Sequence, residues 1–353
     1  MSDILKIVLT GGPCGGKTSA KKYINSFFSK HGYNVIFVPE SATEVIAGGF
    51  KRGTARFQRE VYENQLKNEE KAHLQAKGKT LIVCDRGTMD SLAYYPEGNF
   101  EKFLNSHKSN EIKEMDRYDA VFHLESTACN ACGFYTNSEG HRTETATEAK
   151  KLDERTLSAW VGHNHLRIIE SNSNFEIKMQ KLIDEIAYFA GIYGCLEIEK
   201  KFLVEKPEIK MLENMPLCRG VDITQVYLKS ENGTGRRIRN REGCCYYTEK
   251  RRISNGIREE SEYKITKSQY ENLLKEADEN CSPIEKTRYC FVYKGKYFEL
   301  DIFPFMETRA LLEIELKSPD EEFEIPLFIN ILEDVTDSKE YTNLALAKKL
   351  KNM

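Results

Sequence analysis

The feature that most constrains the fold is a glycine-rich stretch near the start of the chain, Gly11-Gly12-Pro13-Cys14-Gly15-Gly16-Lys17-Thr18. It matches the pattern G-x-x-x-x-G-K-[ST]. Residues 4–9 before it form a short apolar run rich in β-branched side chains, which predicts a buried strand. Residues 19–30 after it carry apolar side chains at helical spacing. A strand, a glycine loop and a helix in this order surround phosphate oxygens with backbone N–H groups, so the stretch predicts a nucleotide-binding loop.

Eight residues of this loop are expected to contact the nucleotide. Backbone N–H groups would bind phosphate oxygens, the Lys17 ammonium would reach the β- and γ-phosphates, and the Thr18 hydroxyl would be a ligand of Mg²⁺. The nucleotide-binding residues are Gly12, Pro13, Cys14, Gly15, Gly16, Lys17, Thr18 and Ser19. An ordinary glycine-rich β–α turn is the alternative, and the flanking strand and helix make it the less favoured one.

Length and composition narrow the class of protein. A chain of 353 residues predicts two domains, which the change of pattern near Gly191 places at 1–190 and 191–353. With 30% charged residues and a net charge of -3, a general nucleic-acid-binding character is not expected. Ten cysteines without a framework spacing, and no leader or membrane-spanning run, favour a cytoplasmic protein with reduced thiols. The pair Cys129-x-x-Cys132 is interpreted as two thiols of a loop rather than as a zinc site.

The first half alternates strands and helices. Strands are expected at 4–9, 34–38, 80–84, 119–124 and 166–170, with helices at 19–30, 57–77, 100–116, 145–162 and 174–188. This alternation predicts an α/β P-loop domain in which helices cover both faces of a parallel sheet. Ligands of such sheets bind at the carboxyl ends of the strands.

The glycine loop, Glu40 and Asp85 fall at those ends, and Arg86 is next to Asp85. Asp85 follows a run of four apolar residues, where an acidic residue would hold Mg²⁺; a helix N-cap is the alternative role. Arg86 would contact the transferred phosphate or the substrate. Glu40 is placed where a small-molecule kinase has a general base, although a solvated glutamate at a strand end fits as well.

Residues 134–155 are interpreted as a lid over the nucleotide. They carry Arg142 and Arg155, which could neutralise charge that develops on the γ-phosphate. An ordinary surface charge on a helix is an equally good interpretation of Arg155. The candidate catalytic residues are therefore Lys17, Glu40, Asp85, Arg86, Arg142 and Arg155.

The segments 39–44, 84–87 and 152–160 carry a family resemblance. They resemble the P-loop domain shared by nicotinamide riboside kinases and TRP-channel translocation-defect proteins, over about residues 4–190. The family includes both kinases and GTP-binding trafficking factors. The resemblance therefore implies the fold and nucleotide binding, and it leaves the reaction open.

Charged residues recur at a spacing of two throughout the second half. In the first expected strand, Glu197, Glu199 and Lys201 would point to one face, and pairs such as Arg237-x-Arg239 and Glu299-x-Asp301 repeat the pattern. A water-facing antiparallel strand explains one such segment. Their recurrence favours a barrel whose inner wall is charged, with bases for phosphates and acids for divalent cations.

The start of this half, Glu197-x-Glu199-x-Lys201, and the segment 313–317 resemble the CYTH (triphosphate tunnel) superfamily over about residues 192–350. The resemblance implies an α+β fold with an antiparallel β-barrel tunnel. It implies metal-binding carboxylates at Glu197, Glu199, Glu313 and Glu315, with Asp301 as a further candidate. It implies phosphate contacts at Lys201, Arg237, Arg239, Lys250, Lys286, Arg288 and Lys317. The pattern leaves open which of Arg236 and Arg237 points inward, because a slip of one residue reverses the faces.

The order of the two domains resembles that of the TRP-channel translocation-defect protein family across the whole chain. The resemblance implies binding of GTP or ATP with Mg²⁺ in the first domain and of a polyphosphate or phosphoinositide headgroup in the second, linked to membrane traffic and to peripheral membrane contact. The alternative is a bifunctional enzyme, a small-molecule kinase joined to a triphosphatase that uses Mg²⁺ or Mn²⁺. No N-K-x-D motif chooses guanine over adenine. The phosphoryl acceptor and the oligomeric state also stay open.

Overall fold

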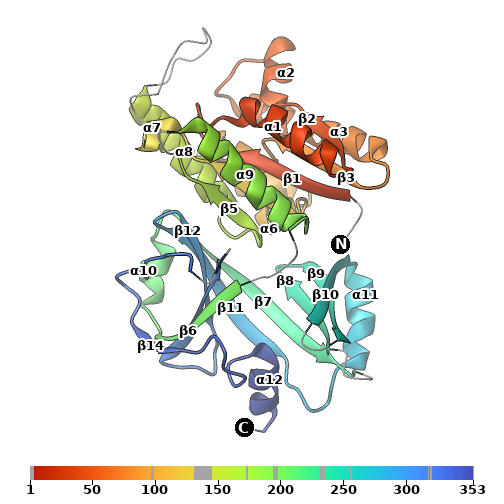
Figure 1. The fold of residues 1–353 in the computed structure, drawn as a ribbon, viewed down its shortest axis with the longest axis vertical. Helices are drawn as coiled ribbons and strands as arrows, with labels where there is room; N and C mark the ends of the chain where they lie inside the picture. The colour runs from red at the N-terminus through yellow and green to blue at the C-terminus, as the bar shows by residue number, and fades with distance from the viewer. Residues whose placement is uncertain are drawn as a thin grey trace. The chain divides into compact units, whose positions relative to one another are not determined.

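The computed structural model describes residues 4–96, 99–130, 145–171, 174–193, 198–230, 235–254, 257–316, 318 and 320–352, and at 130, 250–254 and 257–261 it describes the backbone alone. The chain forms two compact units (Figure 1). The N-terminal unit comprises Ser2–Leu196 with Lys294–Tyr297, and the C-terminal unit comprises Glu197–Tyr293 and Phe298–Met353 with Met1.

The N-terminal unit contains a five-stranded sheet. Its strands are β1 (Ile4–Thr10), β2 (Asn34–Val38), β3 (Thr80–Asp85), β4 (Ala120–Leu124) and β5 (Leu166–Ile169). Their order is β2-β3-β1-β4-β5, and all neighbours are parallel. Every residue of β3 and β4 is buried, as expected when helices cover both faces of a parallel sheet. The predicted parallel α/β sheet is confirmed.

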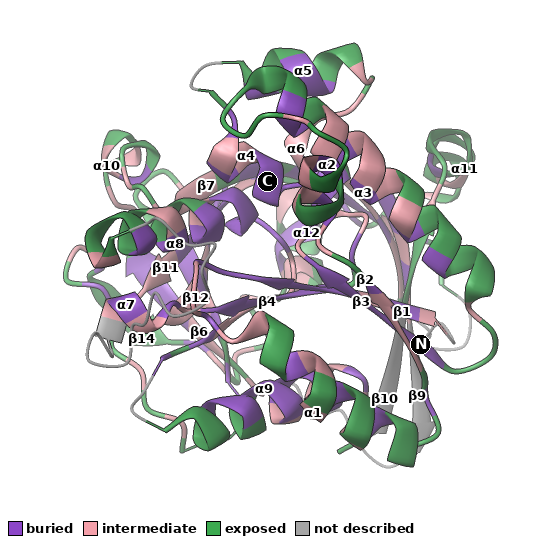
Figure 2. Cartoon of the chain, turned by 90° about the horizontal axis from the view of Figure 1, so that it is seen from above, coloured by how far each residue is buried: buried purple, intermediate pink, exposed green. Residues whose placement is uncertain are grey.

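The helices of this unit lie on both faces of the sheet (Figure 2). They are α1 (Lys17–Lys30), α2 (Ser41–Ala47), α3 (Ala55–Gln75), α4 (Asp90–Tyr94), α5 (Phe100–Ser106), α6 (Glu111–Met115), α7 (Thr127–Asn130), α8 (Ala146–Trp160) and α9 (Phe175–Phe189). Helices α1 and α9 share one apolar core with the sheet, through side chains such as Ile24, Phe28 and Ile186. Helices α3, α4 and α8 cover the opposite face.

One predicted helix of this unit is wrong. The segment 100–116 forms two short helices, α5 and α6, instead of one. Between them Lys108 has a φ of 55°, in the left-handed region that no residue inside an α-helix adopts.

The C-terminal unit is built on a nine-stranded sheet. Its strands are β6 (Ile198–Glu205), β7 (Cys218–Leu228), β8 (Gly235–Arg241), β9 (Cys244–Ser254), β10 (Ile257–Ile265), β11 (Ile284–Tyr293), β12 (Lys296–Ile302), β13 (Arg309–Leu316) and β14 (Ile331–Asp334). Their order is β10-β9-β8-β7-β11-β12-β13-β6-β14. The unit also has the helices α10 (Ile209–Glu213), α11 (Lys267–Leu273) and α12 (Asn343–Lys351), with a 3₁₀ turn at Leu274–Glu276.

The predicted antiparallel sheet is confirmed, whereas the expected closed barrel is not. Within the ranges given above, the end strands β10 and β14 do not pair with each other, so the sheet is open. Strand β14 has only four residues, and its register with β6 is interrupted between Ile331 and Glu333. A short, irregular end strand offers little backbone for closing a barrel.

The two faces of this sheet differ in character. One face carries a large apolar core that includes Phe202, Phe291, Phe298 and Leu312. The opposite face carries the charged side chains of β6, β8, β11, β12 and β13. Next to them, an apolar cluster that includes Leu346 of α12 covers the same face.

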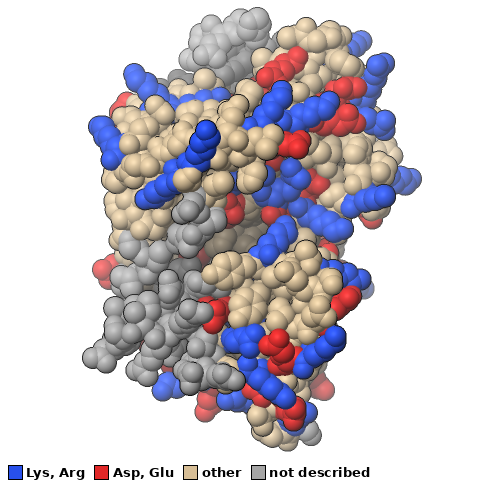
Figure 3. Space-filling model, turned by 90° about the vertical axis from the view of Figure 1, so that its right-hand side faces the viewer, with Lys and Arg blue, Asp and Glu red and all other residues tan. Residues whose placement is uncertain are grey.

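On the surface viewed in Figure 3, basic and acidic side chains are interspersed instead of forming a field of one sign. Among the described residues, no helix combines the length and the apolar character that crossing a membrane requires.

Candidate functional site

The glycine loop connects β1 to α1 and lies against the carboxyl end of β4. A Cβ atom on Gly11 would come within 2.1 Å of the Leu124 carbonyl oxygen, and one on Gly15 within 2.4 Å. Gly16 precedes α1 with a φ of 95°, and Cys14 has a φ of 58°. Close backbone approach therefore requires glycine at positions 11 and 15, and the left-handed φ favours it at position 16, whereas Cys14 adopts such a φ with a side chain.

Lys17 is folded back onto its own loop. Its Nζ donates to the carbonyl oxygens of Gly11 at 2.8 Å and Gly12 at 2.9 Å. Burial, followed by the nearby Arg86 cation, lowers the pKa of Lys17 to about 8. Asp85, Asp90 and Glu40 act in the opposite direction, but they do not offset the burial of the ammonium at the head of the loop.

The two predicted Mg²⁺ ligands lie at neighbouring positions of the fold. Thr18 is exposed in the first turn of α1, and Asp85 is buried at the end of β3, opposite Leu9 of β1. The Asp85 carboxylate forms an ion pair of 2.8 Å with Lys21 of α1. A hydroxyl and a carboxylate suit a hard cation, which would take the place of Lys21 beside the carboxylate.

Arg86 is held between two acidic residues. It has a φ of 72°, its Nε donates to Glu40 at 3.0 Å, and its Nη1 donates to Asp90 Oδ1 at 3.0 Å. Burial would lower the pKa of Arg86, but Tyr94, Asp90 and Glu40 raise it above its ordinary value. Burial would raise the pKa of Glu40, and the Arg86 cation brings it below its ordinary value. Both groups stay ionised, so Glu40 in this form is an acceptor rather than an available acid.

Asp90, the second acidic partner of Arg86, is itself held by three further hydrogen bonds. Its Oδ1 accepts from the Thr10 hydroxyl at 2.5 Å, and its Oδ2 accepts from Gly87 N at 2.9 Å and from Trp160 Nε1 at 3.2 Å. Gln65 of α3 also binds the backbone of Arg86. Its Nε2 donates to the Arg86 carbonyl oxygen, and its Oε1 accepts from the Ser41 hydroxyl. The left-handed backbone of Arg86 is therefore fixed by buried hydrogen bonds.

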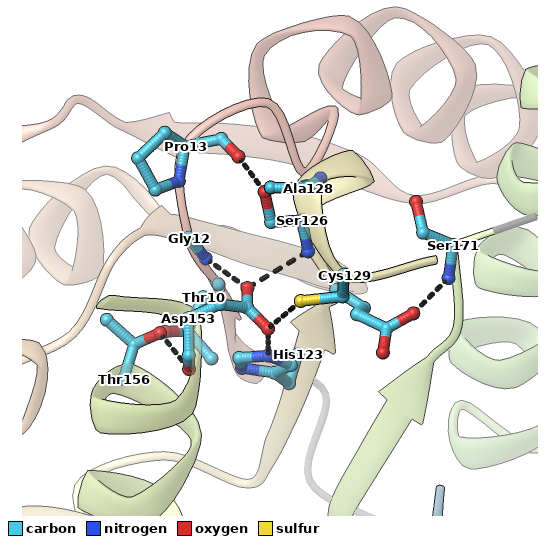
Figure 4. Close-up of polar contacts among 12 residues, drawn as sticks. Thr10, Gly12, Pro13, His123, Ser126, Ala128, Cys129, Asp153, Thr156 and Ser171 are labelled. Carbon is cyan, nitrogen blue, oxygen red and sulfur yellow. Dashed lines mark hydrogen bonds and ion pairs between the residues drawn. The ribbon is translucent and has the colours of Figure 1, made fainter. Parts of the chain in front are cut away.

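Asp153 of α8 lies under the loop (Figure 4). Its Oδ1 accepts from Gly12 N at 2.6 Å and from Ser126 N at 3.0 Å. Its Oδ2 is 3.1 Å from His123 Nε2 and 3.6 Å from Cys129 Sγ. Burial would raise the pKa of Asp153, but His123 and the hydrogen bonds from Gly12 and Ser126 lower it.

In the C-terminal unit, charged side chains from five strands gather on one face of the sheet, which we call the charged face. Strand register aligns them: Glu313 lies opposite both Lys201 and Glu299, and Ile223 lies opposite both Arg241 and Lys286. The face comprises Glu199, Lys201, Arg237, Arg239, Arg241, Lys286, Arg288, Glu299, Asp301 and Glu313.

The register also settles the choice between Arg236 and Arg237. Arg237 and Arg239 are on the charged face, while Arg236 is on the opposite face. There the Nε of Arg236 donates to the Tyr247 hydroxyl, and its Nη2 pairs with Glu276 at 2.9 Å.

Arg288 is the centre of the charged face. Its Nε and Nη2 donate to the two carboxylate oxygens of Asp301 at 2.7 Å each, and Nη2 also donates to Glu313 at 2.7 Å. A fourth hydrogen bond joins Nη1 to Glu299. Burial would lower the pKa of Arg288, but Asp301, Glu299 and Glu313 raise it well above its ordinary value. This fork binds three carboxylates at once.

The two lysines of the face are paired as well. Lys201 Nζ is 2.8 Å from Glu313 and 3.1 Å from Glu199, and Lys286 pairs with Asp301. Burial, and then the neighbouring Glu313, raise the pKa of Glu199 above its ordinary value. The acidic part of the face is thus crowded, and a cation would be favoured beside Glu199 and Glu313.

The row of arginines on β8 has the opposite character. Arg239 donates to Glu262 at 2.9 Å, but its Nε is buried and has no hydrogen-bond partner among the described residues. Burial lowers the pKa of Arg239, and the cations of Arg237, Arg241 and Arg288 lower it further, against the effect of Glu262. Among the described side chains that act on Arg239, three cations oppose one carboxylate, as in a site that receives an anion.

Several predicted site residues are not brought into these clusters. Arg155 is exposed on α8. Glu315 is exposed too, but it lies opposite Glu199 in the register and is therefore at the edge of the charged face. Arg142, Glu197 and Lys317 lie outside the described residues, as does the side chain of Lys250, whose backbone pairs with Gly235. In the described part of the chain, no group of three or more His, Cys, Asp or Glu side chains has the geometry to hold a metal ion.

The structure also places residues that the sequence analysis did not select. Asp153 is on the buried side of α8 with Ala149, Leu157 and Trp160. The helical spacing of these residues places an acidic side chain on an apolar face, and this signal was available from the sequence. Asp90 and Gln65 gave no such signal, because partners such as Thr10 and Ser41 are distant in sequence. Arg241 is a further residue of this kind, a buried cation of β8.

Comparison with known proteins gives two kinds of match. A family model described as an AAA domain matches residues 6–178. Two solved structures of the protein NE1496, titled as a hypothetical protein and as an inorganic triphosphatase, are 32% and 30% identical to this chain. The matches cover 43% of this chain and 98% and 95% of theirs, each with a TM-score of 0.33.

The NadR protein in complex with NAD and AMP-PNP is 14% identical over 53% of this chain and 49% of its own, with a TM-score of 0.38. At 14% identity, this likeness supports no statement about this chain. No curated protein matches the sequence. The N-terminal unit is nevertheless a P-loop nucleotide-binding domain, on the strength of its loop, its parallel sheet and the family model.

Proposed function

The chain belongs to the same family as the protein NE1496 over the 43% of its length that the match covers, and we propose that it binds two phosphate chains, one in each unit. The N-terminal unit binds a purine nucleoside triphosphate, GTP or ATP, with Mg²⁺. The C-terminal unit binds a polyphosphate or a phosphoinositide headgroup on its charged face. The observation that carries the proposal is the arginine row of β8, where the buried Nε of Arg239 has no hydrogen-bond partner in the described part of the chain.

In the N-terminal unit, the loop amides and Lys17 bind the phosphates. Lys17 exchanges two carbonyl oxygens for phosphate oxygens, a better partner for an ammonium group. Thr18 and Asp85 would hold Mg²⁺, which neutralises charge between the phosphates when it is bound. Choice of GTP, and a link between nucleotide state and membrane traffic, come into the proposal through the family resemblance given above.

On the charged face of the C-terminal unit, the carboxylates are on β6, β12 and β13, whereas the arginines of β8 form a separate row. An extended anion bound along β8 would fit this separation of charge. Alternate residues of a strand are about 6.8 Å apart, so Arg237, Arg239 and Arg241 present cations along a line rather than at a point. A chain of phosphates is an anion of that extended form. A face arranged in this way would select an anion by its charge and its length.

The second candidate function is enzymatic. Glu40, Arg86 and Lys17 come together at the carboxyl ends of β1, β2 and β3, where an acceptor hydroxyl could receive a phosphoryl group. Glu199 and Glu313 offer oxygens for Mg²⁺ or Mn²⁺, which could activate water against a bound triphosphate. NE1496 is itself titled an inorganic triphosphatase.

Replacing Arg239 with Met tests the proposed anion site. We expect calorimetry to show that tripolyphosphate binds R239M about 10- to 100-fold more weakly than wild type, because a charge-assisted contact contributes about 1.5–3 kcal/mol. R236M is the matched control, since Arg236 is on the opposite face, and it should bind as wild type does. Equal affinity of R239M and wild type would contradict the proposal.

The same preparation separates binding from catalysis. Phosphate release from tripolyphosphate, GTP and ATP is measured with Mg²⁺ and with Mn²⁺, and vesicles with and without phosphoinositide are compared for co-sedimentation. Binding without turnover supports the first candidate function. Turnover of tripolyphosphate that R239M slows supports the second.

A further inference from the structure

The base of the phosphate loop contains a buried carboxylate that the nucleotide contacts do not require. We propose that Asp153 is a positioning residue for nucleotide binding: it ties the first part of the loop to the turn after β4 and so fixes the loop in its receptive form. The proposal rests on the nucleotide binding proposed above. It concerns how α8 shapes the loop, and it assigns no contact between Asp153 and the ligand.

The peptide group between Gly11 and Gly12 is held from both sides. Its carbonyl oxygen accepts from Lys17 Nζ at 2.8 Å, and its N–H donates to Asp153 Oδ1 at 2.6 Å. Each hydrogen bond has an ionised partner, which makes both stronger than bonds between neutral groups. The orientation of this peptide is thereby fixed, and with it the direction in which the following amides point.

Asp153 also joins this part of the loop to a second loop. The oxygen that accepts from Gly12 accepts from Ser126 N at 3.0 Å, and the Ser126 hydroxyl donates to the Pro13 carbonyl oxygen at 2.5 Å. A Cβ atom on Gly12 would lie 2.8 Å from the Asp153 carboxylate, so glycine at this position allows the close approach. Gly12, Pro13 and Ser126 thus form one hydrogen-bonded assembly around a single carboxylate (Figure 4).

The other carboxylate oxygen is held by His123 and Cys129. His123 is fully buried, and its Nδ1 has no hydrogen-bond partner among the described residues, so the ring proton belongs on Nε2, which faces Asp153. The Cys129 thiol donates to the same oxygen, and burial followed by Asp153 raises its pKa to about 12. The carboxylate accepts four hydrogen bonds in a fixed orientation, which suits a group that positions others.

The experiment compares D153N and D153A with E154Q in the full chain. Glu154 is the exposed neighbour on α8, so E154Q makes the same chemical change without touching the loop. MgGTP and MgATP are the probes, titrated by calorimetry. We expect affinity to fall about 10- to 100-fold in D153A and about 3- to 10-fold in D153N, and to stay within twofold of wild type in E154Q. D153N retains one oxygen for Gly12 and Ser126, but its amide cannot accept from His123.

Hydrogen exchange in the nucleotide-free protein provides the second measurement. The amides of Gly12 and Ser126 should be protected in wild type and E154Q. They should exchange at least about tenfold faster in D153A and about threefold faster in D153N, whose neutral oxygen is a weaker acceptor, while amides in β4 stay unchanged. If wild type binds neither nucleotide, the proposed function fails, and hydrogen exchange still shows whether Asp153 holds the amides of Gly12 and Ser126. If D153A does not fold, D153N decides. A D153N protein with wild-type affinity or wild-type protection of the two amides overturns the inference.

Discussion

Replacing Arg288 with Met is expected to destabilise the C-terminal unit by about 3–5 kcal/mol at pH 7. The guanidinium binds Asp301, Glu299 and Glu313, and Asp301 is fully buried. Methionine fills part of the volume but leaves these carboxylates with Lys286 and Lys201 alone. Removal of one partner from a buried ionic network is costly because the remaining charges lose their compensation.

The loss of stability in R288M should become smaller as the pH falls. Burial would raise the pKa values of Asp301 and Glu313, but in wild type Arg288 holds both below their ordinary values. These carboxylates therefore contribute stability above about pH 4, and that stability is lost as pH falls through the depressed values. In R288M burial would dominate and raise the same pKa values. The difference between variant and wild type should be largest at pH 7 and should narrow towards pH 4.

Calorimetric unfolding of the full chain measures this effect. For a unit of about 150 residues, the expected loss corresponds to a decrease in Tm of about 10 °C. The single tryptophan, Trp160, is buried in the N-terminal unit, so its fluorescence transition should not move. R236M is the control, because its ion pair with Glu276 is half exposed and should be worth less than about 1 kcal/mol. An unchanged calorimetric Tm for R288M would show that the three carboxylates do not depend on Arg288.

Much of this architecture could be predicted because its signals are local in sequence. The glycine loop needs only eight consecutive residues, and each strand of the parallel sheet was visible as a short apolar run. Charged residues two apart on β8, β11, β12 and β13 fall on one face whatever the tertiary structure, because side chains alternate along a strand. Those features follow from backbone periodicity alone.

The remaining features depend on contacts that local patterns do not encode. The two partners of Asp153 in the loops, Gly12 and Ser126, are separated from it by 141 and 27 residues. Asp90 and Thr10 are 80 residues apart. The alternation of charge correctly predicted a sheet face with charged side chains. It could not predict that the sheet is open, because closure depends on strand curvature and on the end strands. Arg155, which the sequence suggested as a lid residue, and the buried Asp153 are two residues apart, and only the helical spacing of their neighbours distinguishes them.

Replacing Lys17 with Met is expected to weaken MgGTP or MgATP binding about 100-fold or more, since Lys17 would supply two charge-assisted hydrogen bonds of about 1.5 kcal/mol each. In the free protein Lys17 donates to Gly11 and Gly12, so its role in binding requires it to leave them. The substitution removes the charge while the loop keeps its glycines. Wild-type affinity in K17M would contradict nucleotide binding through this loop.

Binding through Lys17 should also take up protons. Burial, and then Arg86, lower the pKa of the free ammonium to about 8, and phosphate oxygens would raise it in the complex. The bound state then holds more protons than the free state, so affinity should fall as pH rises through 8, approaching tenfold per unit above it. Calorimetry in two buffers of different ionisation enthalpy should show uptake of about half a proton at pH 8 and about a tenth at pH 7. K17R is the control, because arginine stays ionised and should show no uptake from this position. The same uptake in K17R as in wild type would assign the proton to another group and remove Lys17 as the phosphate-binding cation.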